Sequence, residues 1–344
     1  MITTRLTSRL SISAPVVLAP MSTFADARLA TAVTRAGGLG VLGAGYDDAK
    51  WLSAQFDAAE GTPVGVGFIG WKLMEQPRLL DVALERSPAA VVYSFADPAP
   101  FAPRIHEAHV PLLVQIGNLE EARRAIDLGA TGIIAQGGEA GGHGRGDRST
   151  FTLVPEVADL TGNLAPDTLV LAAGGVVDGR GLAAALSLGA DGAMVGSRFW
   201  ATQESPARPG AQARVVAAGS DDTLRSSVFD IVRGYPWPDG YTGRTLRNSF
   251  VDHWRTQEDT LRGDADDAAR MYRTAAAADD FTIADIHIGE GVGLIRDVPS
   301  VAELLDRMTK DAASILTRLA ATELPHRAVH PLHPSCESPE RCCA

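Results

Sequence analysis

A glycine-rich loop that presents a histidine is the part of the sequence best suited to chemistry. It runs Gln136-Gly137-Gly138-Glu139-Ala140-Gly141-Gly142-His143-Gly144. A lone histidine is more often structural, but four glycines suit neither a helix nor a packed core. They let the backbone pass close to a flat ligand. Because imidazole is a natural proton acceptor near neutral pH, the loop predicts His143 as a catalytic base. Glu139 either orients His143 or caps the following turn.

Two further loops have the composition of a phosphate site. Ala172-Ala173-Gly174-Gly175-Val176 follows one apolar run, and Gly196-Ser197-Arg198 follows the next. Glycines allow backbone N–H groups to approach phosphate oxygens. A short helix beginning near Ser197 adds its positive end, and the Ser197 hydroxyl adds a further donor. Tight turns without a ligand are the alternative, but the agreement of two independent loops favours phosphate binding.

Three other positions could face the same ligand. Ala19-Pro20-Met21 ends an apolar run, where a rigid proline could support the edge of a ring or merely make a turn. Gln115 and Gln136 end two other runs. Inward-facing amides are costly unless they are hydrogen-bonded, which a polar heterocycle or water would achieve.

The elements that must position these loops are eight short apolar runs separated by helical stretches. The continuous apolar character of several runs is typical of parallel strands buried on both faces. Helices are expected at Asp26–Ala36, Asp47–Ala59, Leu119–Leu128 and Gly179–Leu188. The predicted strands are Val16–Ala19, Leu39–Leu42, Val64–Ile69, Ala90–Phe95, Leu112–Ile116, Gly132–Gln136, Thr168–Ala172 and Gly192–Val195.

Eight such steps predict an α/β fold, a (β/α)8 TIM barrel whose site lies where strands end and helices begin. An open doubly wound sheet is the rival, but no GxGxxG follows the first strand. We expect residues 1–203 to form the barrel and residues 204–288 an inserted helical lid. Residues 289–322 would complete the barrel, and residues 325–344 would be disordered. Trp237 and Tyr241 belong either to the core of the lid or to the substrate side.

Composition excludes several partners. The 344 residues carry a formal net charge of −11 with no basic cluster, which argues against nucleic acid and anionic membranes. No apolar run approaches the length of a membrane span, and no signal peptide is evident, so we expect a cytoplasmic protein. Cys336, Cys342 and Cys343 lie near the end of the chain with His330 and His333, in a spacing that fits no zinc pattern. We therefore predict no metal site.

The runs Ala19–Met21, Ala36–Gly40, Gln136–Gly144, Ala172–Val176 and Gly192–Phe199 resemble the nitronate monooxygenase family, formerly called 2-nitropropane dioxygenases. The resemblance covers residues 12–203 and 289–295. NADH:quinone reductases and an FMN-dependent enoyl-acyl-carrier-protein reductase share these motifs. One departure is Gly67, where many members have a flavin-contacting Asn, and another is the absence of a histidine from the fourth strand.

The resemblance implies FMN at the barrel mouth and His143 as the catalytic residue. It also implies oxidative denitrification of alkyl nitronates to carbonyl compounds and nitrite, with a small-molecule substrate and O2 as partners. An NAD(P)H-dependent quinone or enoyl-thioester reductase, a non-redox phosphate-binding barrel and a flavin-holding protein without turnover are the alternatives. The oligomeric state stays open, a homodimer included. Motifs and resemblance together predict these cofactor contacts: Ala19, Pro20, Met21, Gly67, Gln115, Gln136, Gly141, Gly142, Ala173, Gly174, Gly175, Met194, Val195, Gly196 and Ser197.

Overall fold

Eight parallel strands form the centre of the molecule. The computed structural model describes residues 2–46 and 48–322. The strands lie in the order β1-β9-β8-β6-β5-β4-β3-β2. A parallel bridge between Val17 and Leu39 joins the two outer strands, with Leu18 N donating to Leu39 O at 2.9 Å, so the sheet closes into a ring. The barrel is confirmed. Its strands are β1 (Val16–Leu18), β2 (Val41–Ala44), β3 (Gly65–Ile69), β4 (Val91–Ser94), β5 (Leu112–Ile116), β6 (Gly132–Gln136), β8 (Leu169–Ala173) and β9 (Gly192–Val195).

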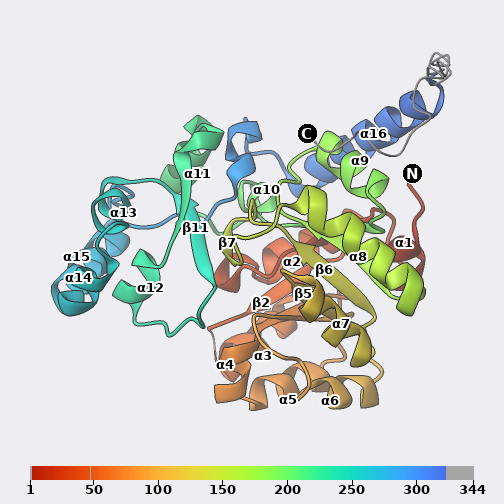
Figure 1. Ribbon diagram of the computed structural model, residues 1–344, viewed down its shortest axis with the longest axis horizontal. Helices are drawn as coiled ribbons and strands as arrows, with labels where there is room; N and C mark the ends of the chain where they lie inside the picture. Colours follow the sequence, from red (N-terminus) through yellow and green to blue (C-terminus); the bar gives the residue numbers. More distant parts are fainter. Residues whose placement is uncertain (1, 47, 323–344) are drawn as a thin grey trace, which may run out of the picture.

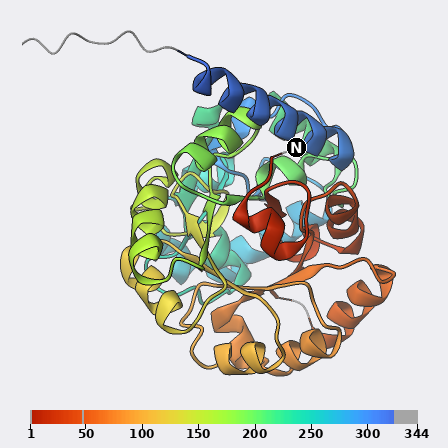
Figure 2. The same ribbon diagram turned by 90° about the vertical axis from the view of Figure 1, so that its right-hand side faces the viewer.

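Helices surround this ring, as Figure 2 shows. The last of them, α16 (Val301–Ala320), packs on α9 and α2 and completes the outer layer. The other helices of the barrel are α1 (Arg5–Leu10), α2 (Ala27–Arg35), α3 (Ala49–Ala58), α4 (Gly70–Glu75), α5 (Arg78–Glu85), α6 (Ala102–Glu107), α7 (Leu119–Asp127), α8 (Thr150–Leu164), α9 (Gly179–Ser187) and α10 (Ser197–Trp200).

The core has two layers because both faces of each strand are covered. Alternate residues such as Val17 and Val92 fill the inside of the barrel, where Leu6 from α1 also packs. Their neighbours, such as Val16 and Val91, face the surrounding helices. This double burial explains why the strands read as continuous apolar runs.

Residues 204–288 form a lid beside the barrel (Figure 1). Most of its regular structure is helical: α11 (Pro209–Ala217), α12 (Val228–Arg233), α13 (Ser249–Trp254), α14 (Glu258–Gly263) and α15 (Ala265–Ala277). The lid also has a small core of its own, which includes Phe229, Phe250 and Tyr272. The lid also contains two strands, β10 (Thr223–Ser226) and β11 (Thr242–Leu246), which the sequence analysis did not predict.

These two strands connect the lid to the barrel. β11 pairs on one side with β10 and on the other with β7 (Gly142–Gly144), which is part of the predicted catalytic loop. His143 lies opposite Gly243 in this three-stranded antiparallel sheet. The loop that carries the histidine is therefore an edge strand of the lid.

The segment that leads from the lid back to the barrel contains a short 3-10 helix, η3 (Glu290–Leu294). No helix in the described part of the chain is long and apolar enough to cross a membrane. The predicted disordered tail, residues 325–344, with Cys336, Cys342 and Cys343, lies outside the described residues.

Candidate active site

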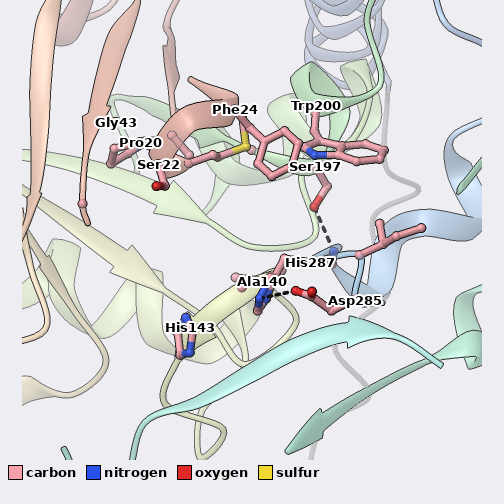
Figure 3. Close-up of a pocket in the computed structure, with 18 of the residues that line it drawn as sticks. Pro20, Ser22, Phe24, Gly43, Ala140, His143, Ser197, Trp200, Asp285 and His287 are labelled. Atoms are coloured by element: carbon pink, nitrogen blue, oxygen red, sulfur yellow. Dashed lines mark hydrogen bonds and ion pairs between the residues drawn. The ribbon is translucent and has the colours of Figure 1, made fainter. Parts of the chain in front are cut away.

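A cavity of about 580 Å³ lies at the carboxyl ends of the barrel strands, beneath the lid. Pro20, Phe24 and Trp200 lie on one side of it, and His143 and His287 on the other (Figure 3). His143 and all fifteen predicted cofactor contacts line this one cavity. The structure thus brings together residues from six strand ends, while their contact with a cofactor stays a prediction.

His143 is paired with a carboxylate that the sequence did not reveal. Its Nε2 lies 2.9 Å from Asp230 Oδ1 and 3.0 Å from Oδ2. Both side chains are almost fully buried, with 9% and 7% of their surface exposed. Asp230 belongs to α12 in the lid, 87 residues along the chain. No local pattern could have predicted this pairing.

The pairing assigns the tautomer of the imidazole. Burial lowers the pKa of His143 to about 4, and this outweighs the opposite effect of the Asp230 carboxylate. The ring is therefore neutral at pH 7, with Nε2–H donating to Asp230. Nδ1 has no hydrogen-bond partner among the described residues and is not fully enclosed by protein. It is the nitrogen that can accept a proton.

Aromatic side chains hold the histidine ring in place. The indole of Trp237 stacks on His143 with ring centroids 3.6 Å apart and planes 4° from parallel. Its Nε1 donates to the hydroxyl of Tyr46, in the loop after β2, at 3.0 Å. Trp237 thus lies on the cavity, whereas Tyr241 is not among the residues that line it. Tyr241 instead packs against Phe95 and Arg145.

Two glutamines fix the backbone of the same residue. Gln136 Nε2 donates to the carbonyl of His143 at 3.0 Å, and Gln115 Nε2 donates to Gln136 Oε1 at 3.1 Å. Neither water nor a heterocycle is needed for these contacts, because the amides partly satisfy each other. This chain of hydrogen bonds gives a structural reason for a glutamine at or next to the end of each of the two strands, β5 and β6.

The glycine loop is also held through its carbonyl oxygens. Arg225 of β10 donates to the carbonyls of Gly138 and Ala140 at 3.0 Å, and to that of Gly144 at 3.2 Å. Burial, together with the neighbouring Arg244, lowers the pKa of Arg225 to about 10. A loop made mostly of glycine has few side chains that could pack against its neighbours. Hydrogen bonds from this lid arginine to the backbone carbonyls fix its conformation instead.

Glu139 caps a helix. Both of its carboxylate oxygens lie 3.0 Å from the backbone N–H of Thr150, the first residue of α8. This contact supplies an acceptor at a helix N-terminus whose own N-cap residue, Ser149, makes no capping bond. Of the two interpretations of Glu139, the orienting role is wrong, since Asp230 holds His143.

The two phosphate-like loops present glycines with unusual backbones. Gly174 has φ +107° and Gly175 has φ +72°, conformations that residues with side chains rarely adopt. A Cβ on Gly175 would meet nothing within 4 Å, so the backbone there faces open space. Ser197 begins α10, and its Oγ accepts from Gly289 N at 2.8 Å, which leaves the hydroxyl proton available.

Gly67 has a structural reason to lack a side chain. A Cβ at this position would lie 2.3 Å from Cβ of Pro20, so a larger residue would displace the proline. In this chain Pro20 occupies the space beside β3. The glycine that this chain has in place of the Asn of many family members is therefore required by the position of Pro20 in the loop after β1.

A second polar group lines the cavity and was not predicted. It consists of Arg233, Tyr272, Asp285 and His287, all from the lid segment. The His287 ring centroid lies 5.4 Å from that of His143. In the sequence, these residues are separated by ordinary lid residues and carry no motif. Among the described residues, no group of histidine, cysteine and acidic side chains is arranged to hold a metal ion.

The comparisons with known proteins decide the family. The family model described as nitronate monooxygenase matches residues 3–66 and 72–311. The chain belongs to the nitronate monooxygenase family. It is therefore an oxidoreductase of a family that is generally flavin-dependent.

The relatives of this family member have several activities. The nitronate monooxygenase npaC of Metarhizium robertsii is 35% identical, over 89% of this chain and 93% of the relative. An indene-carboxyl-CoA dehydrogenase of Rhodococcus jostii is 34% identical, over 66% of this chain and 63% of the relative. Among solved structures, FabK of Thermotoga maritima is 27% identical, with a TM-score of 0.81 over 93% of this chain and 99% of that chain.

Proposed function

We propose that the protein is an FMN-dependent nitronate monooxygenase that converts alkyl nitronates to carbonyl compounds and nitrite with O2. The observation that carries the proposal is the buried, neutral imidazole of His143, held by Asp230, on a cavity that the two glycine loops after β8 and β9 also line. The similarity to npaC over most of both chains supports the same activity.

The residues that line the cavity fit FMN. Gly174, Gly175 and Ser197 offer backbone and hydroxyl donors for one terminal phosphate. Ser94, at the end of β4, has a buried hydroxyl that bonds to none of the described residues, so it offers a donor at the cavity. Pro20 and Met21 supply an apolar wall. In this proposal FMN supplies the electron transfer and the oxygen chemistry.

The protein itself handles the proton. Nδ1 of His143 accepts the α-proton of a neutral nitroalkane, and the electron pair of the broken C–H bond stays on the substrate as the nitronate. Asp230 keeps the imidazole in the required tautomer and stabilises the imidazolium that forms. The lid excludes water from this step. A substrate that arrives as the nitronate has already lost its α-proton and does not need this proton transfer.

A reductase is the second candidate, favoured by the similarity to FabK along the whole of that chain. In this case the holoprotein would take hydride from NAD(P)H and reduce a quinone or an enoyl thioester. Anaerobic mixing of the holoprotein with propyl nitronate or with NADH, while flavin absorbance is followed, separates the two. We expect reduction by the nitronate. Rapid reduction by NADH alone, with no nitronate turnover, would assign the reductase.

The identity of the cofactor is tested on the purified holoprotein. Mass analysis of the released cofactor should give FMN, and FAD would contradict the proposal.

The role of His143 is tested with a variant. His143→Ala should retain FMN and lose neutral nitroalkane turnover by roughly 10²- to 10⁴-fold, the usual contribution of a positioned base. Its loss on preformed nitronate should be smaller. His106→Ala is the control, because His106 contacts Leu128 O on the outside of the barrel. Equal activity of His143→Ala and wild type on both substrates would remove His143 from the mechanism.

A further inference from the structure

An arginine of the lid lines the same cavity as the catalytic histidine. Arg233 is the last residue of α12, one helical turn after Asp230. Its side chain is 23% exposed, whereas that of its ion-pair partner Asp285 is 5% exposed. Both line the cavity, so the guanidinium is the more accessible half of the pair.

The guanidinium is held by three neighbours and still has donors left. Nε donates to the Tyr272 hydroxyl at 2.9 Å, Nη2 donates to Asp285, and Nη1 lies 3.2 Å from His287 Nε2. A guanidinium has five N–H groups. None of the described residues accepts the second N–H of Nη1 or of Nη2. His287 Nε2 and Asp285 Oδ2 lie only 2.9 Å apart, so they take the facing N–H groups of Nη1 and Nη2. The unused N–H groups of these two nitrogens point in different directions, and each can serve one acceptor.

The surroundings keep this group charged and rigid. Although burial opposes it, the Arg233 guanidinium holds the pKa of the Asp285 carboxyl well below its usual range, with His287 acting in the same direction. Tyr272 OH donates to Asp285 Oδ1 at 2.6 Å, which fixes the carboxylate from the other side. The positive charge of Arg233 contributes to the low pKa of His143, so its field reaches the base.

We propose that Arg233 binds the substrate's oxyanion through one unused N–H of its guanidinium. A nitronate carries its negative charge on oxygen, as a carboxylate does, and a hydrogen bond from a charged donor to such an oxygen is roughly twice as strong as one between neutral groups. This assignment rests on the proposed function for the identity of the substrate. It makes the site selective for nitronates that arrive ionised, with His143 beside the carbon end.

The test measures anion binding apart from turnover. The holoprotein is titrated with sodium nitrite, and separately with propionate, under anaerobic conditions while the flavin spectrum is recorded. Arg233→Gln should raise the Kd of both anions, and the KM for propyl nitronate, by roughly 10- to 100-fold, the worth of a hydrogen bond to a charged group. The KM for neutral nitropropane should change much less. A purely structural role in the lid would not separate the charged from the neutral substrate.

Two further variants keep the result interpretable. Arg208→Gln removes the same charge from the same cavity, but Arg208 pairs with Asp279 and is 62% exposed. It should bind nitrite like the wild type, and an equal loss in Arg208→Gln would overturn the assignment. Arg233→Lys keeps the charge on a shorter, flexible side chain, whose ammonium group cannot hold Tyr272, Asp285 and an anion in the same geometry as the planar guanidinium. It should bind the anions several-fold more weakly even if the glutamine variant fails to fold, and unchanged binding in Arg233→Lys would also overturn it.

The two proposals can fail separately. Nitrite binding that depends on Arg233, without nitronate turnover, would remove the monooxygenase assignment and keep the anion site. Nitronate turnover by the wild type, with nitrite binding and nitronate KM unchanged in Arg233→Gln, would keep the monooxygenase assignment and remove the anion site.

Discussion

At the scale of single residues, the proposed base consists of two side chains from two different parts of the chain. His143 lies in the loop after β6, and Asp230 lies in the lid. The carboxylate can only accept from Nε2, which leaves Nδ1 free of a proton. An amide at the same position can instead donate to Nε2, which would move the proton to Nδ1 and abolish the base.

Asp230→Asn should therefore retain FMN and lose neutral nitroalkane turnover by roughly 10²- to 10⁴-fold, the range seen when a base loses its orienting carboxylate. Steady-state kinetics on nitropropane and on its nitronate would measure this loss. Asp252→Asn serves as the control, because Asp252 is an exposed lid residue paired with Arg247. Full activity of Asp230→Asn would show that the pair does not set the tautomer.

The low pKa of His143 determines the pH profile. The neutral ring is the active form, so activity is lost as the pH falls through the pKa of about 4 and is present above it. The kcat/KM for neutral nitropropane should stay flat from pH 7 to about pH 5, where an ordinary histidine would already be protonated. Rapid pH-jump assays from pH 7 measure this before unfolding can contribute. A limb centred near pH 6.5 would contradict the burial argument.

The sequence predicted some of these residues for a physical reason. The glycines and His143 are adjacent in the chain, so their composition is a local signal. Asp230 meets His143, and Arg233 and His287 reach the cavity, only after the lid has folded onto the barrel. The neighbours of these three residues in the sequence are ordinary. The sequence alone left two roles possible for Glu139. Its partner is the backbone N–H of Thr150, and a backbone group has no sequence signature.

At the scale of elements, the proposed phosphate site can be tested by a substitution in the loop after β8. Gly175→Val should abolish FMN retention, because the new side chain would fill the space that the cradle leaves open. Flavin content after purification and the Kd from reconstitution would measure the effect. Gly61→Val is a matched control. Gly61 has φ +74°, close to the +72° of Gly175, also with nothing within 4 Å of a Cβ, but it does not line the cavity.

Both valine variants carry similar backbone strain, of about 1–2 kcal/mol for a left-handed conformation. Gly61→Val should thus lose stability and keep its flavin. Equal flavin content in the two variants would show that Gly175 is only a tight turn.

Strands buried on both faces were easier to predict than strands of the lid. The barrel runs are short, apolar and repeated, which indicates parallel strands. β10 and β11 have four and five residues, and each includes an arginine, Arg225 and Arg244, in opposed register. Arg225 donates hydrogen bonds to the carbonyls of the glycine loop. This role places a charged residue in β10 and interrupts the apolar pattern that would have indicated a strand.

At the scale of the whole molecule, α16 is the element that completes the outer layer of the barrel. Its buried face includes Val301, Leu304, Leu305 and Met308. Each such side chain contributes about 1.5–3 kcal/mol on burial, so the face as a whole matches the roughly 5–15 kcal/mol of stability of an entire domain.

A chain truncated after residue 300 should therefore fail to fold, as measured by circular dichroism and recovery in the soluble fraction. A chain truncated after residue 325 should retain FMN and activity, since the tail is not expected to contribute to the site. A stable, flavin-bound product of the first truncation would show that the ring closes without α16. Loss of flavin from the second would assign the tail a role.

The pairing of β7 with β11 has a consequence for attempts to re-engineer the enzyme. The proposed base belongs to the barrel by sequence, because His143 follows β6, but its contacts come from the inserted lid. Gly243 pairs with it, Asp230 accepts its hydrogen bond and Trp237 stacks on its ring. A chimaera that received the lid of a relative would also exchange the partner, the stacking ring and the opposite strand of its own histidine. Substrate range and proton chemistry in this scaffold are therefore inherited together, and a new lid must be designed around the imidazole.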